Sequence, residues 1–487
     1  MPRRSRRSAC RSCPSAPSWC RSSTDATPIS ASRHIARCFT CRARLATATR
    51  PNAIACRRRC ATSRCHTSCS HSATRMAAIA PSTGWWRRRS MPRPRLLVVA
   101  QRFGDVAGGA EAHARQVATR LAAADLNVEV ATTTARDYWT WQNDFGAGED
   151  RVDGLLVRRF RVAAPRASDF RRAERMAFAE GHSLADEQRF IEAQGPVVPE
   201  LLDFLVAEGR SYDHILFFTY IYYPTVFGLP LVPDRAVLVP TAHDEPAIRL
   251  TSYRALFHAP RAIAFNTEEE REMVHRVFRN RRVPNEIVGV GVDLAPTPSG
   301  ERFRAAHGLE GPLLLYVGRI VQSKGCDELF DYFGRWRELD PTRNRATLVV
   351  AGHAEMPIPD RPDVRHVGYL SDDEKFDAFD ACDVFVIPSR YESMSMVTLE
   401  AWAMGRPVLC SAESDVLRGI SRRSGGGLFY RGFPEFAEAL ELLLSDDSVR
   451  ARLGERGRSF VGETYTWPRI VDTYLDLFAE VRARNRS

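Results

Sequence analysis

The chain has 487 residues, with 69 Lys or Arg against 59 Asp or Glu, so its formal net charge at neutral pH is +10. This excess lies at one end: the first 90 residues hold 19 arginines and one acidic residue, a net charge of +18, whereas the remaining 397 carry −8. A mildly acidic body argues against nucleic acid as a partner, and no apolar run is long enough to predict a membrane-spanning helix.

Residues 1–90 differ from the rest of the chain, because they hold nine of the twelve cysteines and have no apolar periodicity. The CxxC pairs Cys10/Cys13 and Cys38/Cys41 would suit zinc, and an Arg- and Ser-rich, acid-poor composition would suit a transit peptide. We favour a disordered or non-native extension, because so few apolar side chains cannot build a core. Met91 is then a plausible start, since a predicted strand follows it.

Residues 91–290 are predicted to form an α/β domain. Short apolar runs predict strands at 96–100, 128–132, 214–218, 236–240 and 263–266. Gly108 and Gly109 begin the helix after the first strand, where backbone N–H groups would face an anion, although a glycine pair before a helix more often forms only a tight turn. His243 follows the strand 236–240, at the sheet edge where α/β proteins bind ligands.

The stretch 135–196 lacks a strand pattern, and we expect it to be irregular apart from one Arg-rich helix near 169–195. The aromatic residues Tyr138, Trp139 and Trp141 would either stack on a sugar or pack in the core. The basic helix would either lie on an anionic membrane surface or expose a solvated face. We favour core packing and solvation over both functional alternatives.

Residues 291–487 are predicted to form a second α/β domain, with a plausible linker at 296–302 near its start. The strand 313–317 leads into a turn that holds Gly318, Arg319 and Lys324. Two cations in one turn suit a diphosphate, Arg by two parallel hydrogen bonds and Lys as a point charge. The chain has only two lysines, which makes Lys324 more notable. A C-terminal amphipathic helix is expected to cross back to the first domain.

Residues 383–410 predict a strand, a turn, a helix from Met394 to Met404 and a second strand. The N–H groups at Met394, Ser395 and Met396 would offer a phosphate site at the helix start. Glu392 lies in the turn and Glu400 among apolar helix residues. A buried carboxylate needs hydrogen-bond donors, which the hydroxyls of a sugar or ribose would supply. The alternative is that Glu400 is solvated or pairs with an arginine.

This segment resembles the Glu-x7-Glu signature of the retaining family-4 glycosyltransferases. The matching residues are Pro388, Ser389, Glu392, Leu399, Glu400, Ala401, Ala403, Gly405, Pro407 and Val408. The chain departs from the pattern at Ser395, where many members of the family have glycine, a residue that lets the backbone approach a ligand closely.

The resemblance implies the GT-B fold, an α/β architecture of two Rossmann-like domains whose parallel sheets face an interdomain cleft. Residues 91–290 would bind the acceptor, and residues 291–487, which include the crossover helix, would bind a nucleotide sugar. The implied roles are ribose binding by Glu400, donor-sugar binding by Glu392 and His243, and diphosphate binding by Gly318, Arg319 and Lys324, with Gly108 and Gly109 beneath the donor phosphates.

The implied function is that of a soluble, cytoplasmic hexosyltransferase that retains anomeric configuration. It would transfer a sugar from a nucleoside diphosphate sugar to a glycan or lipid-linked acceptor in cell-surface polysaccharide biosynthesis, with no cofactor and no metal. Peripheral contact with the inner membrane face stays an open alternative. A GT-B phosphorylase and a nucleotide-sugar epimerase are the alternative enzymes. Nucleic-acid binding by residues 1–90 is a third function, which the acidic body disfavours.

Overall fold

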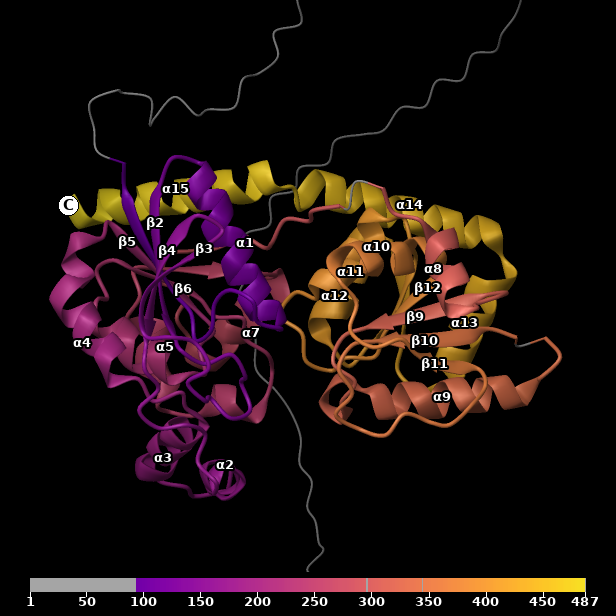
Figure 1. Cartoon of the computed structure of the whole chain (residues 1–487), viewed down its shortest axis with the longest axis horizontal. Coiled ribbons are helices and arrows are strands. Elements are labelled where there is room, and N and C mark those ends of the chain that lie inside the picture. The colour runs from indigo at the N-terminus through magenta and orange to yellow at the C-terminus, as the bar shows by residue number, and fades with distance from the viewer. Residues whose placement is uncertain (1–92, 295–296, 344, 487) are drawn as a thin grey trace, which may run out of the picture. The chain divides into compact units, whose positions relative to one another are not determined.

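A computed structural model of the chain describes residues 93–294, 297–343 and 345–486. The predictions for residues 1–90 and for a start at Met91 lie outside these ranges. The described residues belong to one compact unit, 84–487, which contains two sheets, each flanked by helices (Figure 1).

The first sheet has eight strands in the order β3-β4-β2-β1-β5-β6-β7-β8. All neighbours are parallel except the β3–β4 pair. The strands are β1 (Arg95–Val99), β2 (Asn127–Thr133), β3 (Gly148–Val152), β4 (Leu155–Phe160), β5 (His214–Phe218), β6 (Ala236–Val239), β7 (Ala262–Phe265) and β8 (Asn285–Ile287). Both faces are covered, which explains why β6, and β1 and β5 after their first residues Arg95 and His214, are continuously apolar rather than alternating.

Helices of the first domain bury the two faces of this sheet in separate cores. They are α1 (Gly109–Ala123), α2 (Phe170–Ala177), α3 (Leu184–Gln194), α4 (Pro199–Glu208), α5 (Tyr223–Gly228), α6 (Tyr253–His258) and α7 (Glu268–Phe278). Leu96 and Val98 of β1 pack into the core that contains α1, whereas Leu97 and Val99 pack into the core that contains α2 to α7. Alternate residues of one strand therefore serve opposite faces.

The prediction of an irregular stretch with one helix at 135–196 is wrong in two respects. Strands β3 and β4 form an antiparallel hairpin joined by Asp153 and Gly154, both with positive φ. An Asp-Gly pair is a hairpin signal, but β3 is largely exposed at the sheet edge and has no apolar pattern. The expected helix is two helices, α2 and α3, and Ser183 begins α3 with a capping box that includes Asp186.

The second sheet has six parallel strands in the order β11-β10-β9-β12-β13-β14. The strands are β9 (Leu313–Val317), β10 (Thr347–Ala351), β11 (Val364–His366), β12 (Val384–Ile387), β13 (Val408–Ser411) and β14 (Gly427–Tyr430). The helices are α8 (Gly300–His307), α9 (Cys326–Leu339), α10 (Asp372–Ala381), α11 (Met396–Ala403), α12 (Asp415–Ser424), α13 (Phe433–Ser445), α14 (Asp447–Thr464) and α15 (Trp467–Arg486). The strand order reverses between β9 and β12, and ligands of open parallel sheets commonly bind beyond the carboxyl ends of the strands at such a point.

The C-terminal helix α15 returns to the first domain, as predicted. It packs on α1, β7 and β8, and Figure 1 shows it lying along the first sheet. Phe478 of α15 stacks on His214 of β5, with ring centroids 4.6 Å apart. The first domain is therefore completed by the last segment of the chain.

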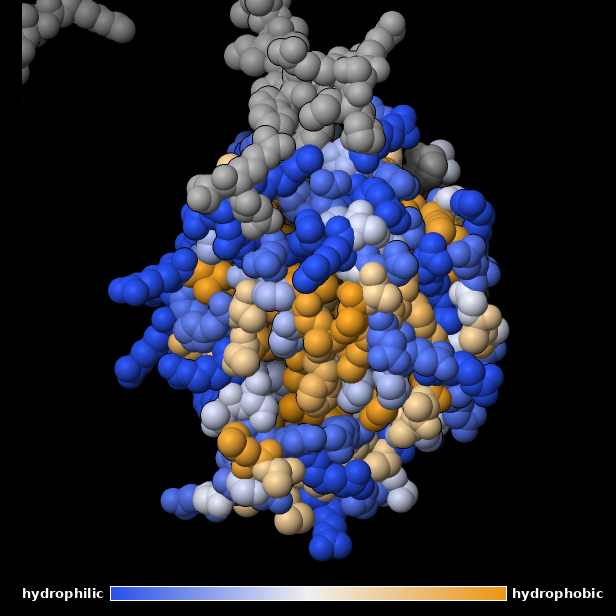
Figure 2. Space-filling model, turned by 90° about the vertical axis from the view of Figure 1, so that its left-hand side faces the viewer, coloured by the Kyte–Doolittle hydropathy of each residue, from blue (hydrophilic) through white to orange (hydrophobic). Residues whose placement is uncertain are grey.

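The described surface is mixed in character. On the face drawn in Figure 2, apolar surface gathers in a central band bordered by charged side chains. Exposed apolar residues of the first domain include Leu184, Val206 and Leu231. Among the described residues, no helix combines the length and the apolar character that crossing a membrane requires.

Candidate active site

Two turns meet at the carboxyl ends of β9 and β12. The first passes through a 3₁₀ turn, Gln322–Lys324, and ends at Gly325, which has a φ of 75°. A Cβ on Gly325 would lie 2.5 Å from the carbonyl oxygen of Pro388, so only glycine allows this close approach. This approach brings Lys324 beside the turn that carries Glu392.

Lys324 and Glu392 form an ion pair, in which Lys324 Nζ donates to Glu392 Oε1 over 2.7 Å. The sequence predicts separate partners for these side chains, the diphosphate for Lys324 and the donor sugar for Glu392. The structure instead brings them into direct contact. The pair is partly buried, with 28% and 12% of the two side chains exposed. The ion pair therefore fixes the Lys324 ammonium and the Glu392 carboxylate next to each other in the cleft.

A cavity of about 280 Å³ lies beside this pair and is lined from both domains. It brings together His243 of the first domain and Glu392 of the second, while the donor-sugar role that the resemblance implies for them stays a prediction. The other predicted residues do not line it. The lining consists of Ala242, His243, Asp244, Glu269, Glu270, Met273, Arg390, Tyr391, Glu392, Glu413, Ser414, Asp415 and Val416. Such a polar lining suits a ligand rich in hydroxyl groups.

Glu270, a residue that the sequence does not single out, organises the His243 side of the cavity. Its carboxylate accepts hydrogen bonds from the backbone N–H of Ala242 over 2.6 Å and of Asn266 over 2.7 Å. Burial raises the pKa of Glu270 to about 7, although both donors oppose that rise. The side chain therefore ties the loop after β6 to the loop after β7.

The loop after β7 also reaches the second domain. Thr267 Oγ1 donates to the carbonyl oxygen of Ser393 over 3.2 Å, next to Glu392. Arg423 of α12 forms two hydrogen bonds with Glu269, of 2.5 and 2.9 Å. These contacts align the His243 loop with the Glu392 turn across the cleft.

Arg319 lies outside the cavity and contacts the first domain through Tyr138. Its guanidinium is 5.0 Å from the Tyr138 ring centroid and hydrogen-bonds the phenol oxygen, and it lies 3.7 Å from Glu355.

Trp141 packs in the core as predicted, fully buried, and its Nε1 donates to the carbonyl oxygen of Gln194 over 2.7 Å. Trp139 stays largely exposed.

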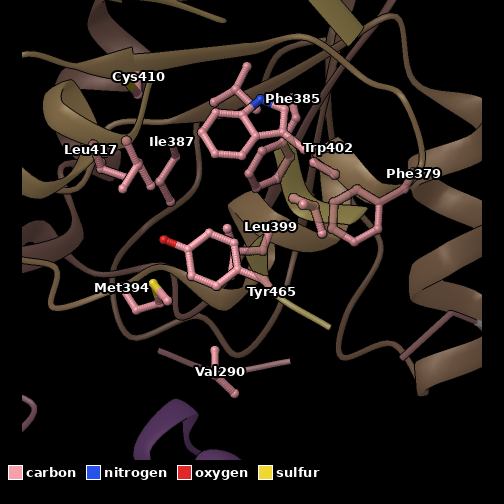
Figure 3. Packing of buried hydrophobic residues seen from close by; sticks show 14 of the residues in the cluster. Val290, Phe379, Phe385, Ile387, Met394, Leu399, Trp402, Cys410, Leu417 and Tyr465 are labelled. Atoms are coloured by element: carbon pink, nitrogen blue, oxygen red, sulfur yellow. The ribbon is translucent and has the colours of Figure 1, made fainter. Parts of the chain in front are cut away.

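The helix predicted to begin at Met394 begins two residues later, at Met396. Ser395 has a φ of 66°, so it adopts the left-handed conformation that glycine favours, and its hydroxyl lies 2.8 Å from Thr398 Oγ1. The Met394 side chain is buried and packs beside Tyr465 in the core (Figure 3). Only the backbone at these positions is therefore suited to meet a ligand.

Glu400 is buried and pairs with Lys375 of α10, whose Nζ donates to Glu400 Oε1 over 2.9 Å. The alternative of a solvated or arginine-paired Glu400 is therefore wrong, because the partner is a lysine. Burial raises the pKa of the Glu400 carboxyl, and Lys375 works against that rise. Lys375 is the second of the two lysines in the chain, and that rarity is the one signal that could have found it.

The predicted glycine pair has a structural task of its own. A Cβ on Gly108, whose φ is 153°, would lie 2.1 Å from Glu111 Oε2, whereas one on Gly109 would meet open space. Glu111 is buried and accepts hydrogen bonds from Arg102 over 2.7 Å and from Gln101 over 2.9 Å. The absence of a side chain at Gly108 thus leaves room for the buried Arg102–Glu111 ion pair at the start of α1. Gly318, also at positive φ, lies next to Arg319.

Metal-ligating side chains do not cluster in the part of the chain that the structure describes. Within residues 93–294, 297–343 and 345–486, no group of three or more His, Cys, Asp or Glu could hold a metal ion. The zinc alternative concerned residues 1–90, which lie outside these ranges. The three cysteines of the described part, Cys326, Cys382 and Cys410, are buried free thiols.

The solved structure of Anabaena HepE in complex with UDP-glucose has the same two-domain architecture. It superposes with a TM-score of 0.59 over 79% of this chain and 99% of its own, at 14% identity. At that identity the likeness concerns the fold alone, and the fold of this chain is GT-B.

Two curated relatives match part of the chain. The D-inositol 3-phosphate glycosyltransferase of Jonesia denitrificans is 26% identical over 270 residues, 51% of this chain and 63% of the relative. The lipopolysaccharide core biosynthesis glycosyltransferase LpsE of Rhizobium meliloti is 32% identical over 215 residues, 41% of this chain and 58% of the relative. The chain thus spans about three fifths of the length of these relatives. Residues 311–446 match the family described as Glycosyl transferases group 1, and it is to this group that the second domain is similar.

Proposed function

We propose that this protein is a glycosyltransferase that transfers a hexose-like sugar from a nucleoside diphosphate sugar, with retention of anomeric configuration. One observation carries the proposal: the cavity between the domains is lined by both His243 and Glu392, and Lys324 is held against Glu392. The similarity of residues 311–446 to group 1 glycosyl transferases supports it.

The charges around the cleft suit the two halves of such a donor. Carboxylates and one histidine line the cavity, which suits sugar hydroxyls that donate hydrogen bonds. Lys324 and Arg319 occupy the turn after β9, outside the cavity lining, and would bind the diphosphate. Glu400 would accept hydrogen bonds from the ribose hydroxyls. The backbone N–H groups of residues 394–396, and the loops at Gly108, Gly109 and Gly318, would lie near the phosphates.

In the proposed reaction the bond between the anomeric carbon and the diphosphate oxygen breaks as the acceptor hydroxyl attacks from the same face. The acceptor proton passes to the departing phosphate oxygen. Lys324 and Arg319 would stabilise the charge that builds on that oxygen, a preorganised electrostatic contribution that needs neither a metal nor a cofactor. Glu392 and His243 would hold the sugar in position.

The acceptor is proposed to be a glycan or a lipid-linked glycan of the cell surface. The named role of the Rhizobium meliloti relative in lipopolysaccharide core biosynthesis supports this class. Arg171, Arg172 and Arg175 of α2 are exposed beside Met176, which would allow peripheral contact with an anionic membrane in the cytoplasm.

Calorimetry tests the donor site. We expect the full chain to bind one of UDP, GDP and ADP, and the variant Lys324→Ala to bind it at least about tenfold more weakly, because it loses a charge on the diphosphate. Arg335→Ala is the matched control, since Arg335 is an exposed cation on α9 whose ion-pair partner is Asp331. A folded wild-type protein that binds none of the three nucleotides would contradict the proposal.

Nuclear magnetic resonance tests the chemistry. With a sugar donor that carries whichever nucleoside diphosphate binds, and with an oligosaccharide acceptor, the anomeric coupling of the product should match that of the donor. An inverted coupling would contradict retention. Conversion of the donor to an epimer in the absence of any acceptor would identify an epimerase instead.

A further inference from the structure

We propose that Lys375 is a positioning residue for Glu400, holding one carboxylate oxygen so that the other stays open for a ribose hydroxyl. The inference rests on the proposed function, because it concerns how the same site would recognise a nucleoside diphosphate. Three observations carry it: the geometry of the pair, an unpartnered oxygen, and the choice of lysine.

The first observation is that Lys375 reaches Glu400 from a neighbouring helix. Lys375 lies on α10 and Glu400 on α11, and Nζ to Oε1 measures 2.9 Å. The same Nζ donates to Asp372 Oδ1 over 3.1 Å, one turn earlier on α10. Only 17% of the Lys375 side chain and 10% of the Glu400 side chain are exposed, while Asp372 is 92% exposed. The two side chains are thus fixed by packing as well as by charge.

The second observation is that Glu400 Oε2 is buried without a hydrogen-bond partner. Buried carboxylate oxygens are normally satisfied, so an oxygen left without a donor needs an explanation. A ligand hydroxyl would supply that donor. Glu400 lies on the helix that follows β12, beside the point where the strand order of the second sheet reverses.

The third observation is that the chain uses lysine here. Among its 69 basic residues only two are lysines, and these two pair with Glu392 and Glu400. Arginine commonly binds both oxygens of a carboxylate through its planar fork, whereas lysine is a point charge that occupies one. A lysine therefore favours the ionised carboxylate against the effect of burial and leaves its second oxygen without a protein donor.

If the Lys375–Glu400 ion pair were only structural, its loss would weaken the binding of a nucleotide with and without ribose hydroxyls equally. The test therefore compares nucleotides that have these hydroxyls with nucleotides that lack them. Calorimetry compares UDP, GDP and ADP with the 2′,3′-dideoxy form of each, on the full chain and on Lys375→Met, which keeps an unbranched side chain one atom shorter and removes the charge. We expect wild type to prefer the bound nucleotide over its dideoxy form. Lys375→Met should lose that preference through at least about tenfold weaker binding of the ribose form. Its affinity for the dideoxy form should be unchanged.

A pH series provides the second readout. Lys375 and Asp372, both on α10, are the charged groups that act on Glu400. Without Lys375, burial and the charge of Asp372 would raise the pKa of the Glu400 carboxyl unopposed, so the preference of Lys375→Met for the ribose form should recover as the pH rises. The preference of wild type, and of Lys375→Arg with its charge retained, should depend less on pH. Asp372→Asn is the matched control and should bind like wild type, because it leaves the Lys375–Glu400 contact in place.

The outcomes separate the two proposals. If wild type binds no nucleotide, the proposed function fails and this inference fails with it. If wild type prefers the ribose form and Lys375→Met keeps that preference, or loses affinity equally for both forms, the role of Lys375 is overturned and the donor site stands. If Lys375→Met does not fold, Lys375→Arg serves as the test. The inference would be overturned if nucleotide binding by Lys375→Arg depended on pH differently from binding by wild type.

Discussion

Three carboxylates of the candidate site depend on two kinds of partner. Glu392 and Glu400 are held by lysines, whereas Glu270 is held by the backbone N–H groups of Ala242 and Asn266. An amide donor offsets less of the cost of burying a charge than a cation does. Glu270 is therefore the carboxyl whose protonation should follow pH near neutrality.

The stability of the protein should fall as the pH rises from about 5 to 8 because of Glu270. Burial raises the pKa of Glu270 from its ordinary value of 4.5 to about 7. The folded state thus holds an extra proton between these values, and the associated stability is fully present below pH 4.5 and lost as the pH rises through 7. Relative to Glu270→Gln, wild type should lose on the order of 3 kcal/mol over that range.

Denaturant unfolding of both proteins between pH 5 and pH 8 measures this difference. Glu272→Gln, on the exposed side of the same helix, is the control. The difference in free energy of unfolding between Glu272→Gln and wild type should depend far less on pH than the difference between Glu270→Gln and wild type. Parallel stability curves for wild type and Glu270→Gln would contradict the assignment of a protonated Glu270.

Helix packing around α11, which carries Glu400, depends on glycines in α14. A Cβ on Gly457 would lie 2.3 Å from Trp402 Cδ1, and one on Gly454 would lie 1.9 Å from the carbonyl oxygen of Gly405. Trp402 is fully buried and its Nε1 donates to the carbonyl oxygen of Gly426 over 2.8 Å, so the indole cannot move aside. Figure 3 shows Trp402 within this core, near Phe385 and Leu399. These contacts fix α11, and with it Glu400, against α14.

Two glycine-to-alanine substitutions in α14 should therefore have opposite effects. Gly457→Ala should lower the free energy of unfolding by about 1–3 kcal/mol, because the new methyl group overlaps a rigid indole. Gly462→Ala should raise it by about 0.5–1 kcal/mol, because alanine favours helix and a Cβ there meets nothing within 4 Å. Thermal and denaturant unfolding measure both. A rise in the free energy of unfolding of Gly457→Ala would show that helix propensity, not packing, decides there, and a fall for Gly462→Ala would contradict the propensity argument.

The first domain depends on the end of the chain for part of its core. Helix α15 packs on α1, β7 and β8, and its first residue, Trp467, donates through Nε1 to Asp293 Oδ2 over 3.0 Å. Asp293 in turn binds Arg120 of α1. Asp293, in the segment that connects the two sheets, is therefore bound both by α1 and by α15. This arrangement favours cooperative unfolding of the two domains.

Removing one aromatic ring from α15 should reveal this dependence. Burial lowers the pKa of His214 to about 4, and its ring stacks on Phe478. Phe478→Ala should cost about 3–5 kcal/mol of stability. It should also let water reach the imidazole, so that the pKa of His214 rises towards 6.5, as titration by nuclear magnetic resonance would record. Leu442→Ala, at an exposed site on α13, is the control and should change neither quantity appreciably. An unchanged pKa of His214 in Phe478→Ala would contradict this account.

Local sequence was sufficient for the elements with strong patterns. Apolar runs predicted most of the parallel strands, the Glu392-to-Glu400 segment predicted its strand, turn and helix, and the amphipathic C-terminal pattern predicted α15. Sequence alone was insufficient where the pattern is weak: β3 is a polar edge strand, and the break between α2 and α3 rests on a single capping box. The boundaries proposed for the two domains, at 290 and 291, stay a prediction.

For the site, the sequence by itself determined which side chains carry chemistry: two glutamates eight residues apart, a histidine after a strand, and cations in one turn. Only the tertiary structure decided how they pair. Lys324 meets Glu392, Lys375 meets Glu400 from another helix, and His243 shares a cavity with Glu392 across the cleft. The physical reason is that spacing along a chain sets local geometry, whereas the partner of a buried charge depends on which segments, 25 or 68 residues apart, fold against each other.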